Sequence, residues 1–171
     1  MDRLNSELKT QAITNGLCEE WQGIWKEDRT PEQLIEMMYN GMDFCLIHHW
    51  PSNDFIKQNF DLDTLRQNGV LVDDTYSLLN PANSLILGNS NAKIRYNFTY
   101  IGNVNVRDHS DVTLTAKGRS SVIVHLFDDA SITAHQADNA SIVIIKHSTN
   151  VHIHSNEGVK IKEELNFVLY R

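Results

Sequence analysis

The stretch Asp111–Lys146, DVTLTAKGRSSVIVHLFDDASITAHQADNASIVIIK, repeats a unit of ten residues. In each copy two apolar residues stand two positions apart, as Val122 and Val124 do, and a polar segment follows. Such alternation places the apolar residues on one face of a short strand, and the polar segment then forms a corner. Two inward columns extend the pattern beyond this stretch: Ala92, Gly102, Val112, Val122, Ile132 and Ile142, and then Ile94, Val104, Leu114, Val124, Ala134 and Ile144.

The corners repeat as well. Small residues stand two positions before the first column, with Tyr100 as the exception: Ser90, Ser110, Ser120, Ala130 and Ala140. Turn-forming residues stand two positions before these: Asp108, Gly118, Asp128 and Asp138. Internal repetition is typical of stacked units that bury their faces against one another. We therefore predict a small β-solenoid over residues 82–155, in which Val151 and Ile153 continue the inward pattern because the last copy is one residue short. An antiparallel β-meander or barrel is the alternative, but small residues at a fixed corner favour the solenoid, since successive corners must nest.

The outward positions differ between alternate repeats. If two repeats make one coil of about 20 residues, alternate repeats lie on opposite sheets, with coils about 4.8 Å apart. One sheet then exposes only polar residues, whereas the other exposes Ile123, Val143 and Ile145 beside His125. An apolar cluster on a surface indicates a contact site, so we expect a partner or the helical half to cover it. Alternatively, these residues stand there because β-branched side chains suit strands.

The N-terminal half has helical periodicity. Leu4, Leu8 and Ala12 recur at four-residue spacing, and Thr30-Pro31 is a favourable helix start. Residues 1–80 carry a net charge of −8 and residues 81–171 carry +1, which together give −7. We predict an α+β protein with an acidic helical head, residues 1–80, and a solenoid of ten-residue repeats, residues 81–171. The alternating tail Leu165–Tyr170 is expected to be a C-terminal strand that caps the last coil or pairs with a neighbouring chain.

Two segments carry a family resemblance. Asp128-Asp129-Ala130-Ser131-Ile132 and Asp138-Asn139-Ala140-Ser141-Ile142 resemble a short-repeat family of phage and prophage proteins. The resemblance covers the repeat half alone, and this chain departs from the tighter eight-residue spacing of that family. It implies a β-solenoid with a structural or interaction role, a mobile-element origin, and no catalytic residues.

Composition excludes several classes of protein. A chain of 171 residues with 41% hydrophobic and 22% charged residues is typical of a globular protein. No apolar run approaches the roughly 18 residues that span a bilayer, and the start lacks the apolar core of a secretion signal, so we expect a cytoplasmic protein without membrane contact. Direct nucleic-acid binding is not expected, because the repeat half has no basic stripe.

Histidines and a cysteine are the candidates for chemistry. Cys45 lies near Asp43, His48 and His49, residue types that a cysteine nucleophile requires, but an inert thiol is expected inside the apolar run Phe44–Ile47. His152 and His154 alternate on one strand face, and His125 and His135 share an outward column. No zinc-type spacing or adjacent carboxylate accompanies them, so neither a metal nor another cofactor is expected.

These observations predict a non-enzymatic structural or protein-interaction module that binds protein partners and forms a homo-oligomer, and the resemblance implies a phage or prophage type. The predicted contact residues are Ile123, His125, Val143 and Ile145 on the solenoid, and the acidic pairs Glu19-Glu20 and Asp73-Asp74. The first alternative is an inhibitor whose acidic head blocks a basic, nucleic-acid-binding site on a target enzyme. The second is a small enzyme that uses Cys45 with His48 or His49.

Overall fold

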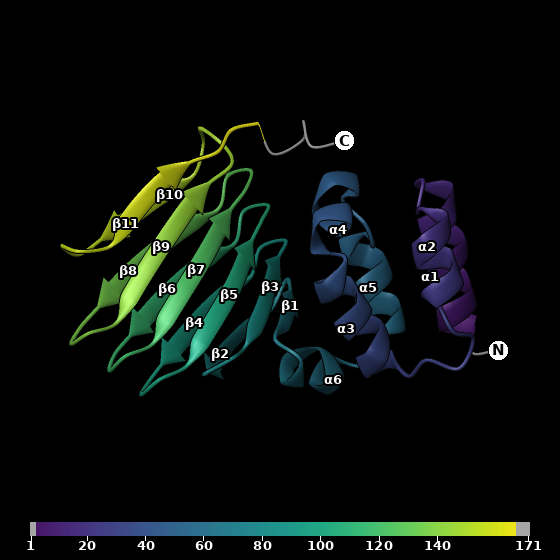
Figure 1. Ribbon diagram of the computed structural model, residues 1–171, viewed down its shortest axis with the longest axis horizontal. Coiled ribbons are helices and arrows are strands. Elements are labelled where there is room, and N and C mark those ends of the chain that lie inside the picture. The colour runs from purple at the N-terminus through teal and green to yellow at the C-terminus, as the bar shows by residue number, and fades with distance from the viewer. Residues whose placement is uncertain (1–2, 167–171) are drawn as a thin grey trace. The chain divides into compact units, whose positions relative to one another are not determined.

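A computed structural model describes residues 3–166, and the chain divides into two compact units, residues 1–64 and 65–171 (Figure 1). The first unit is helical and the second is built of parallel strands, so the α+β prediction is confirmed. The helices are α1 (Arg3–Thr14), α2 (Glu19–Ile24), α3 (Pro31–Asn40), α4 (Met42–His48), α5 (Asn53–Asn59) and α6 (Leu62–Gln67), which crosses the division.

Polar side chains fix the buried tryptophans of the helical unit. Trp25 Nε1 donates to Asn5 Oδ1 at 2.6 Å, and both residues are buried. Trp50 Nε1 donates to Gln11 Oε1 at 3.3 Å, and the two indole rings lie 6.3 Å apart. Helix α3 begins with the predicted cap: Thr30 Oγ1 accepts from the Gln33 N–H, and Gln33 Oε1 accepts from the Thr30 N–H. The helical unit therefore has an apolar core of its own, in which hydrogen bonds pair the indole N–H groups of Trp25 and Trp50.

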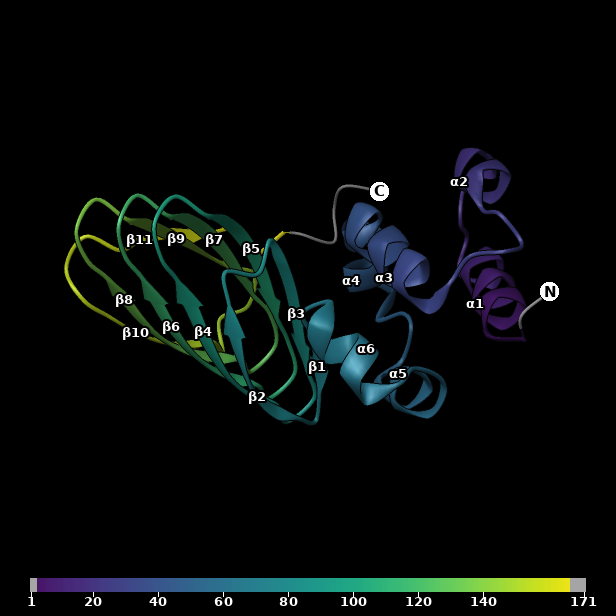
Figure 2. The same cartoon turned by 90° about the horizontal axis from the view of Figure 1, so that it is seen from below.

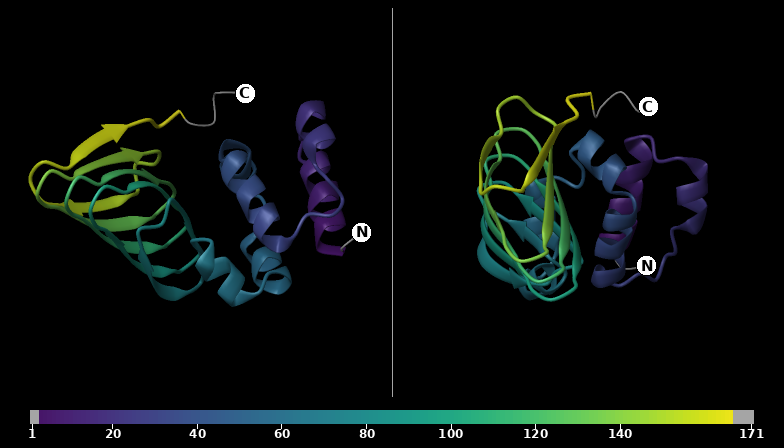
Figure 3. Two further views of the ribbon diagram at one scale, coloured as in Figure 1. Left: turned by 60° about the horizontal axis from the view of Figure 1, so that its bottom comes forward. Right: turned by 60° about the vertical axis from the view of Figure 1, so that its left-hand side comes forward.

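The second unit is a parallel β-solenoid with two facing sheets (Figures 2 and 3). Sheet A has the order β1-β3-β5-β7-β9-β11, and sheet B has the order β10-β8-β6-β4-β2. The predicted solenoid is thus confirmed, and the antiparallel alternative is wrong because every strand pair is parallel. The strands are β1 (Val70–Val72), β2 (Thr75–Leu79), β3 (Asn83–Leu87), β4 (Asn91–Tyr96), β5 (Ile101–Val106), β6 (Asp111–Ala116), β7 (Ser121–Leu126), β8 (Ser131–Gln136), β9 (Ser141–Lys146), β10 (His152–Ser155) and β11 (Lys160–Glu163).

The register explains the repeat. Ala92 lies beside Val112 and Val112 beside Ile132, so a coil takes 20 residues and each ten-residue repeat supplies one strand. Both predicted inward columns are buried. Gly102 interrupts the first column because the ring of Tyr96 fills its place, and a Cβ at Gly102 would lie 2.3 Å from that ring. The core therefore uses one aromatic side chain where the other coils use two smaller ones.

The solenoid begins earlier than residue 81. Strands β1 and β2 pair with β3 and β4, and the compact unit starts at Leu65. This first coil was assigned to the helical head because its spacing is shorter: Val70 pairs with Leu85, and Tyr76 pairs with Ala92. The boundary between the helical unit and the solenoid therefore lies between residues 64 and 65, and not between residues 80 and 81 as predicted.

The last coil also differs from its prediction. Ile153 pairs with Ile132, so the corner before β10 holds one residue more than the others, where we expected one fewer. Asn150 N–H donates to Ser148 Oγ at 3.1 Å and closes this longer corner. The predicted strand Leu165–Tyr170 lies mostly outside the described residues, and Leu165 and Asn166 form a turn. Among residues 3–166, no helix has the length and apolarity needed to cross a membrane.

Candidate functional site

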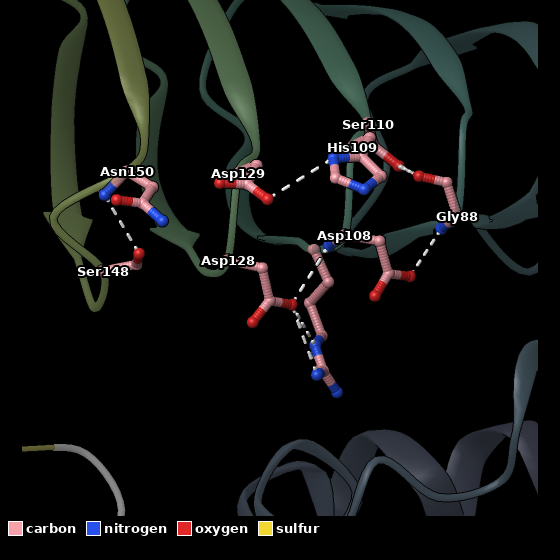
Figure 4. Close-up of polar contacts among 9 residues, drawn as sticks. Gly88, Asp108, His109, Ser110, Asp128, Asp129, Ser148 and Asn150 are labelled. Carbon is pink, nitrogen blue, oxygen red and sulfur yellow. Dashed lines mark hydrogen bonds and ion pairs between the residues drawn. The ribbon is translucent and has the colours of Figure 1, made fainter.

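Successive coils are joined at two kinds of corner, and the corner that follows sheet A is polar (Figure 4). Asp108 and Asp128 have φ angles of 59° and 55°, a left-handed conformation that Asp tolerates better than most residues. Each carboxylate accepts from the backbone of the coil below: Gly88 N–H donates to Asp108 at 2.7 Å, and Asp108 N–H donates to Asp128 at 3.2 Å. Arg107 Nε adds an ion pair to Asp128 at 3.3 Å. This corner therefore uses its polar groups to tie one coil to the next.

Among the corners that follow sheet B, the one after β4 presents apolar side chains instead, whereas the corners after β6 and β8 are polar. We call Leu79, Phe98, Tyr100 and Ile101 the aromatic corner. Backbone hydrogen bonds join its loops, because Asn103 N–H donates to Ala82 O and Ser121 N–H donates to Tyr100 O. Its side chains are exposed by 66% (Leu79), 75% (Phe98), 46% (Tyr100) and 78% (Ile101). In the described part of the solenoid, four of the eight large apolar side chains that are exposed belong to this corner.

Phe98 occupies a strained position of the aromatic corner. Its φ angle is 65°, although a side chain as large as Phe rarely adopts the left-handed conformation. The equivalent positions of other coils hold Asn80, Gly118 and Asp138, which suit that conformation. Gly118 lies directly above Phe98, and a Cβ there would approach the Phe98 carbonyl oxygen to 2.6 Å. Strain of this kind costs of order 1–3 kcal/mol and concentrates at functional sites.

Basic residues flank the aromatic corner. Arg119 N–H donates to Phe98 O, which places Lys117 and Arg119 on the next coil. Both side chains are exposed, and neither has a carboxylate partner among residues 3–166. The corner therefore combines exposed apolar area with unneutralised positive charge.

The structure places the predicted solenoid contact residues side by side on sheet A. Ile123 pairs with Val143, and His125 pairs with Ile145. Ile123 is 43% exposed, whereas the other three are half-buried, so this face is less open than the aromatic corner. Its role as a contact surface stays a prediction.

A ring stack that the sequence did not reveal continues this face. His147 lies with its ring 4.4 Å from Phe127 and 5.2 Å from His125. His147 Nδ1 donates to the Glu164 carbonyl, so in the neutral ring Nε2 accepts from His125 Nδ1 at 2.9 Å. Burial lowers the pKa of His147, and the bond to Glu164 opposes that shift. The stack ties β7, β9 and the end of β11 together.

The two predicted acidic pairs lie in different units. Glu19 and Glu20 begin α2 and are exposed. Asp73 and Asp74 belong to the first corner of the solenoid, where Asp73 Oδ1 accepts from the Asn89 N–H. The Arg66 guanidinium binds Asp74 through two hydrogen bonds of 2.8 and 2.9 Å, which lower the pKa of that carboxyl group. Asp73 and Asp74 are therefore not part of an acidic helical head.

Cys45 lies inside the helical unit. Its thiol faces the Met38 carbonyl at 3.8 Å, and burial raises the pKa of Cys45 to about 12. The ring of His48 lies 4.5 Å from that of Phe44 in a tilted arrangement, and His49 ends α4 in a left-handed conformation. A thiol protonated at neutral pH is a poor nucleophile, so this arrangement does not favour the enzyme alternative.

The late histidines stand on the outer face of sheet B. His152 pairs with Ser131 and His154 pairs with Thr133, while His135 lies one column away. Within the described range, no three His, Cys, Asp or Glu side chains gather closely enough to hold a metal ion.

Sequence analysis does not identify the aromatic corner, because it marks only Tyr100 there as an exception to the repeat. The signal was its place in the repeat: Phe98 stands ten residues before Asp108, at a position where Asp, Gly or Asn recurs. Comparison of the chain with protein-family models, curated proteins and solved structures gave no match.

Proposed function

We propose that this chain is a non-enzymatic protein-interaction module in which the solenoid presents the aromatic corner to a protein partner. The observation that carries the proposal is the exposed, strained Phe98 at the centre of an apolar patch. Interface centres are enriched in aromatic side chains, and large exposed apolar patches mark contact surfaces. The resemblance to phage repeat proteins leads us to propose a phage- or prophage-type accessory role.

The solenoid supplies a rigid support for this surface. The loop that holds Phe98 and Tyr100 is hydrogen-bonded to the coils on both sides, because Asn97 N–H donates to Asn80 Oδ1 and Ser121 N–H donates to Tyr100 O. The buried columns of Val, Ile and Leu belong to the same coils. A surface held in one conformation loses little entropy on binding. Lys117 and Arg119 at its border favour a partner with acidic residues around an apolar centre.

Site-specific photo-crosslinking tests the proposal. A benzophenone amino acid replaces Phe98 in one variant, Ile123 in a second and the exposed Asp129 in a third, and each protein is irradiated in a lysate of the source organism. We expect one adduct of defined mass from position 98 alone, suppressed by excess wild-type protein and not by excess Phe98→Asn protein. Equal labelling from position 129 would refute the proposal, and labelling from position 123 alone would move the site to sheet A. An adduct of twice the chain mass would assign the corner to self-association.

A further inference from the structure

We infer that the edge of β2 binds an extended, acidic segment of the partner protein, which adds to sheet B as a further strand. This inference rests on the proposed function and names the conformation and charge of the partner. The β2 edge is continuous with the aromatic corner, because Leu79 belongs to both.

The backbone of β2 has one unpaired side. It ends sheet B and pairs with β4 alone. Asn91 N–H donates to Asp74 O, and Asn80 N–H donates to Arg95 O. In a parallel pair the residues that face the neighbour alternate, so Thr75, Ser77 and Leu79 point their N–H and C=O groups away from β4. Within the described residues these groups have no backbone partner, and all three residues are exposed. The Asp74 carboxylate accepts from the Thr75 N–H, so Ser77 and Leu79 carry the open part of the edge.

The edge strands at the two ends of the solenoid differ in length and in charge. At the C-terminal end, β11 carries Lys160, Lys162 and Glu163, and β10 carries two histidines. Charged and short edge strands discourage the addition of another strand. Strand β2, with the sequence TYSLL, has five residues and neither a charge nor a proline. An edge left open in this way is a template for strand addition.

A hollow next to this edge is lined in part by Lys93, which favours an acidic added strand. Its volume is about 460 Å³, and it is lined by Thr75, Tyr76, Ser77, Asn91 and Lys93. Small side chains on β2 leave room for Lys93 to reach over them. An added strand would lie about 10 Å from β4, a distance that the Lys side chain and a Glu side chain can bridge together. Lys93 and its neighbour Arg95 have no carboxylate partner within residues 3–166.

The opposite face of the added strand meets an apolar surface. Tyr76 stands in register with the inward residue Ala92 but is exposed at the open end of the core. The Arg66 guanidinium lies 4.7 Å from the centroid of its ring and is itself held by Asp74. Strand residues alternate between faces, so the partner segment combines acidic residues toward Lys93 with apolar residues toward Tyr76.

Titration of the full-length protein with a synthetic six-residue peptide of alternating Glu and Val tests this inference. We expect the amide signals of Thr75, Ser77 and Leu79 to shift in NMR spectra and their hydrogen exchange to slow at least tenfold. A peptide of alternating Lys and Val should bind at least tenfold more weakly. No binding of the acidic peptide at millimolar concentration, or equal binding of both peptides, would overturn the inference.

Two pairs of variants locate the contact. Ser77→Pro removes an N–H that β4 does not use, so the fold tolerates it but strand addition does not; Ser77→Ala keeps the N–H and is its control. Lys93→Glu should abolish binding of the acidic peptide, whereas Lys162→Glu on β11, at the other end of the solenoid, should retain it. Unchanged peptide binding in both Ser77→Pro and Lys93→Glu would refute the inference, even if crosslinking from position 98 supports the proposed function. A wild-type dimer in sedimentation that becomes a monomer in Ser77→Pro would show a second copy on this edge and would also overturn it.

Discussion

Replacing Phe98 by Asn should give a more stable protein than replacing it by Ala. Both variants lose the same ring and differ in how well the new residue accepts a φ angle of 65°. Asn visits the left-handed region readily, whereas Ala retains the steric cost that Phe has there. The comparison therefore isolates backbone strain from the loss of side-chain contacts.

The magnitude follows from exposure and conformation. Phe98 is 75% exposed, so about a quarter of its side chain, roughly 50 Å², is removed from water. At about 25 cal/mol per Å², both variants lose about 1 kcal/mol of burial. The left-handed conformation costs an ordinary residue roughly 1–2 kcal/mol, and Asn recovers much of it. Phe98→Ala should therefore be about 1 kcal/mol less stable than the wild type, and Phe98→Asn should be close to it.

Urea unfolding can assign the change to the solenoid. All three tryptophans lie in the helical unit, so their fluorescence follows that unit, whereas the amide I infrared band of β-strands follows the solenoid. The matched control is Ile101→Asn against Ile101→Ala, because Ile101 is equally exposed and has no left-handed φ angle. Equal midpoints for the two Phe98 variants would refute the strain argument, as would a difference of the same size at Ile101.

Three further outcomes follow from the packing and the ionisable groups. Gly102→Ala should lower the free energy of unfolding of the solenoid by about 1–3 kcal/mol, because its Cβ would lie 2.3 Å from the Tyr96 ring. The control Gly23→Ala, at the exposed glycine of α2, should cause no loss, and equal effects of the two substitutions would contradict this reasoning. Ellman's reagent at pH 8 should react with Cys18 alone in the folded protein and with both cysteines after unfolding, because Cys45 is buried and burial raises its pKa to about 12. Rapid reaction of both thiols in the folded protein would show that the helical core is open. Since Arg66 lowers the pKa of Asp74, the stability that this pair contributes is present above the ordinary Asp pKa and is lost as the pH falls through the lowered value. The difference in free energy of unfolding between wild type and Asp74→Asn should therefore disappear below about pH 4. A difference that stays constant with pH would show that the pair does not titrate.

Strand periodicity predicts the solenoid well because a two-residue alternation and a ten-residue spacing are both local properties of the sequence. Val112, Val122 and Ile142 fall where the columns place them, and Asp108 and Asp128 take the turn conformation that their residue type favours. The apolar run Val70–Val72 indicates a strand, but nothing local assigns it to a first coil. Its two strands pair across 15 and 16 residues, as Val70 with Leu85 and Tyr76 with Ala92 show, and a shorter connection removes them from the repeat.

The predicted contact residues show the same division between local and non-local information. Alternation alone brings Ile123 next to Val143, and sequence reasoning predicts that neighbourhood. The hydrogen bond between His125 and His147 depends on the corner after β9, and the ion pair between Arg66 and Asp74 depends on how α6 leads into β1. These contacts join residues whose spacing follows no repeat, so no pattern in the chain predicts them.

Two residues that depart from the repeat lie in a single corner, and their exposure and backbone strain indicate a contact with a partner. Tyr100 stands where other coils bury Ser or Ala, and Phe98 stands where they use Asp, Asn or Gly. Phe98 is 75% exposed, so the burial of its ring recovers only about 1 kcal/mol of the roughly 1–2 kcal/mol that its strained backbone costs. Strain that is only partly recovered within the chain is expected where binding supplies the rest, since strained residues cluster at ligand contacts. If Phe98→Asn keeps full affinity for a crosslinked partner, the strain has no functional return and the aromatic corner is not the contact.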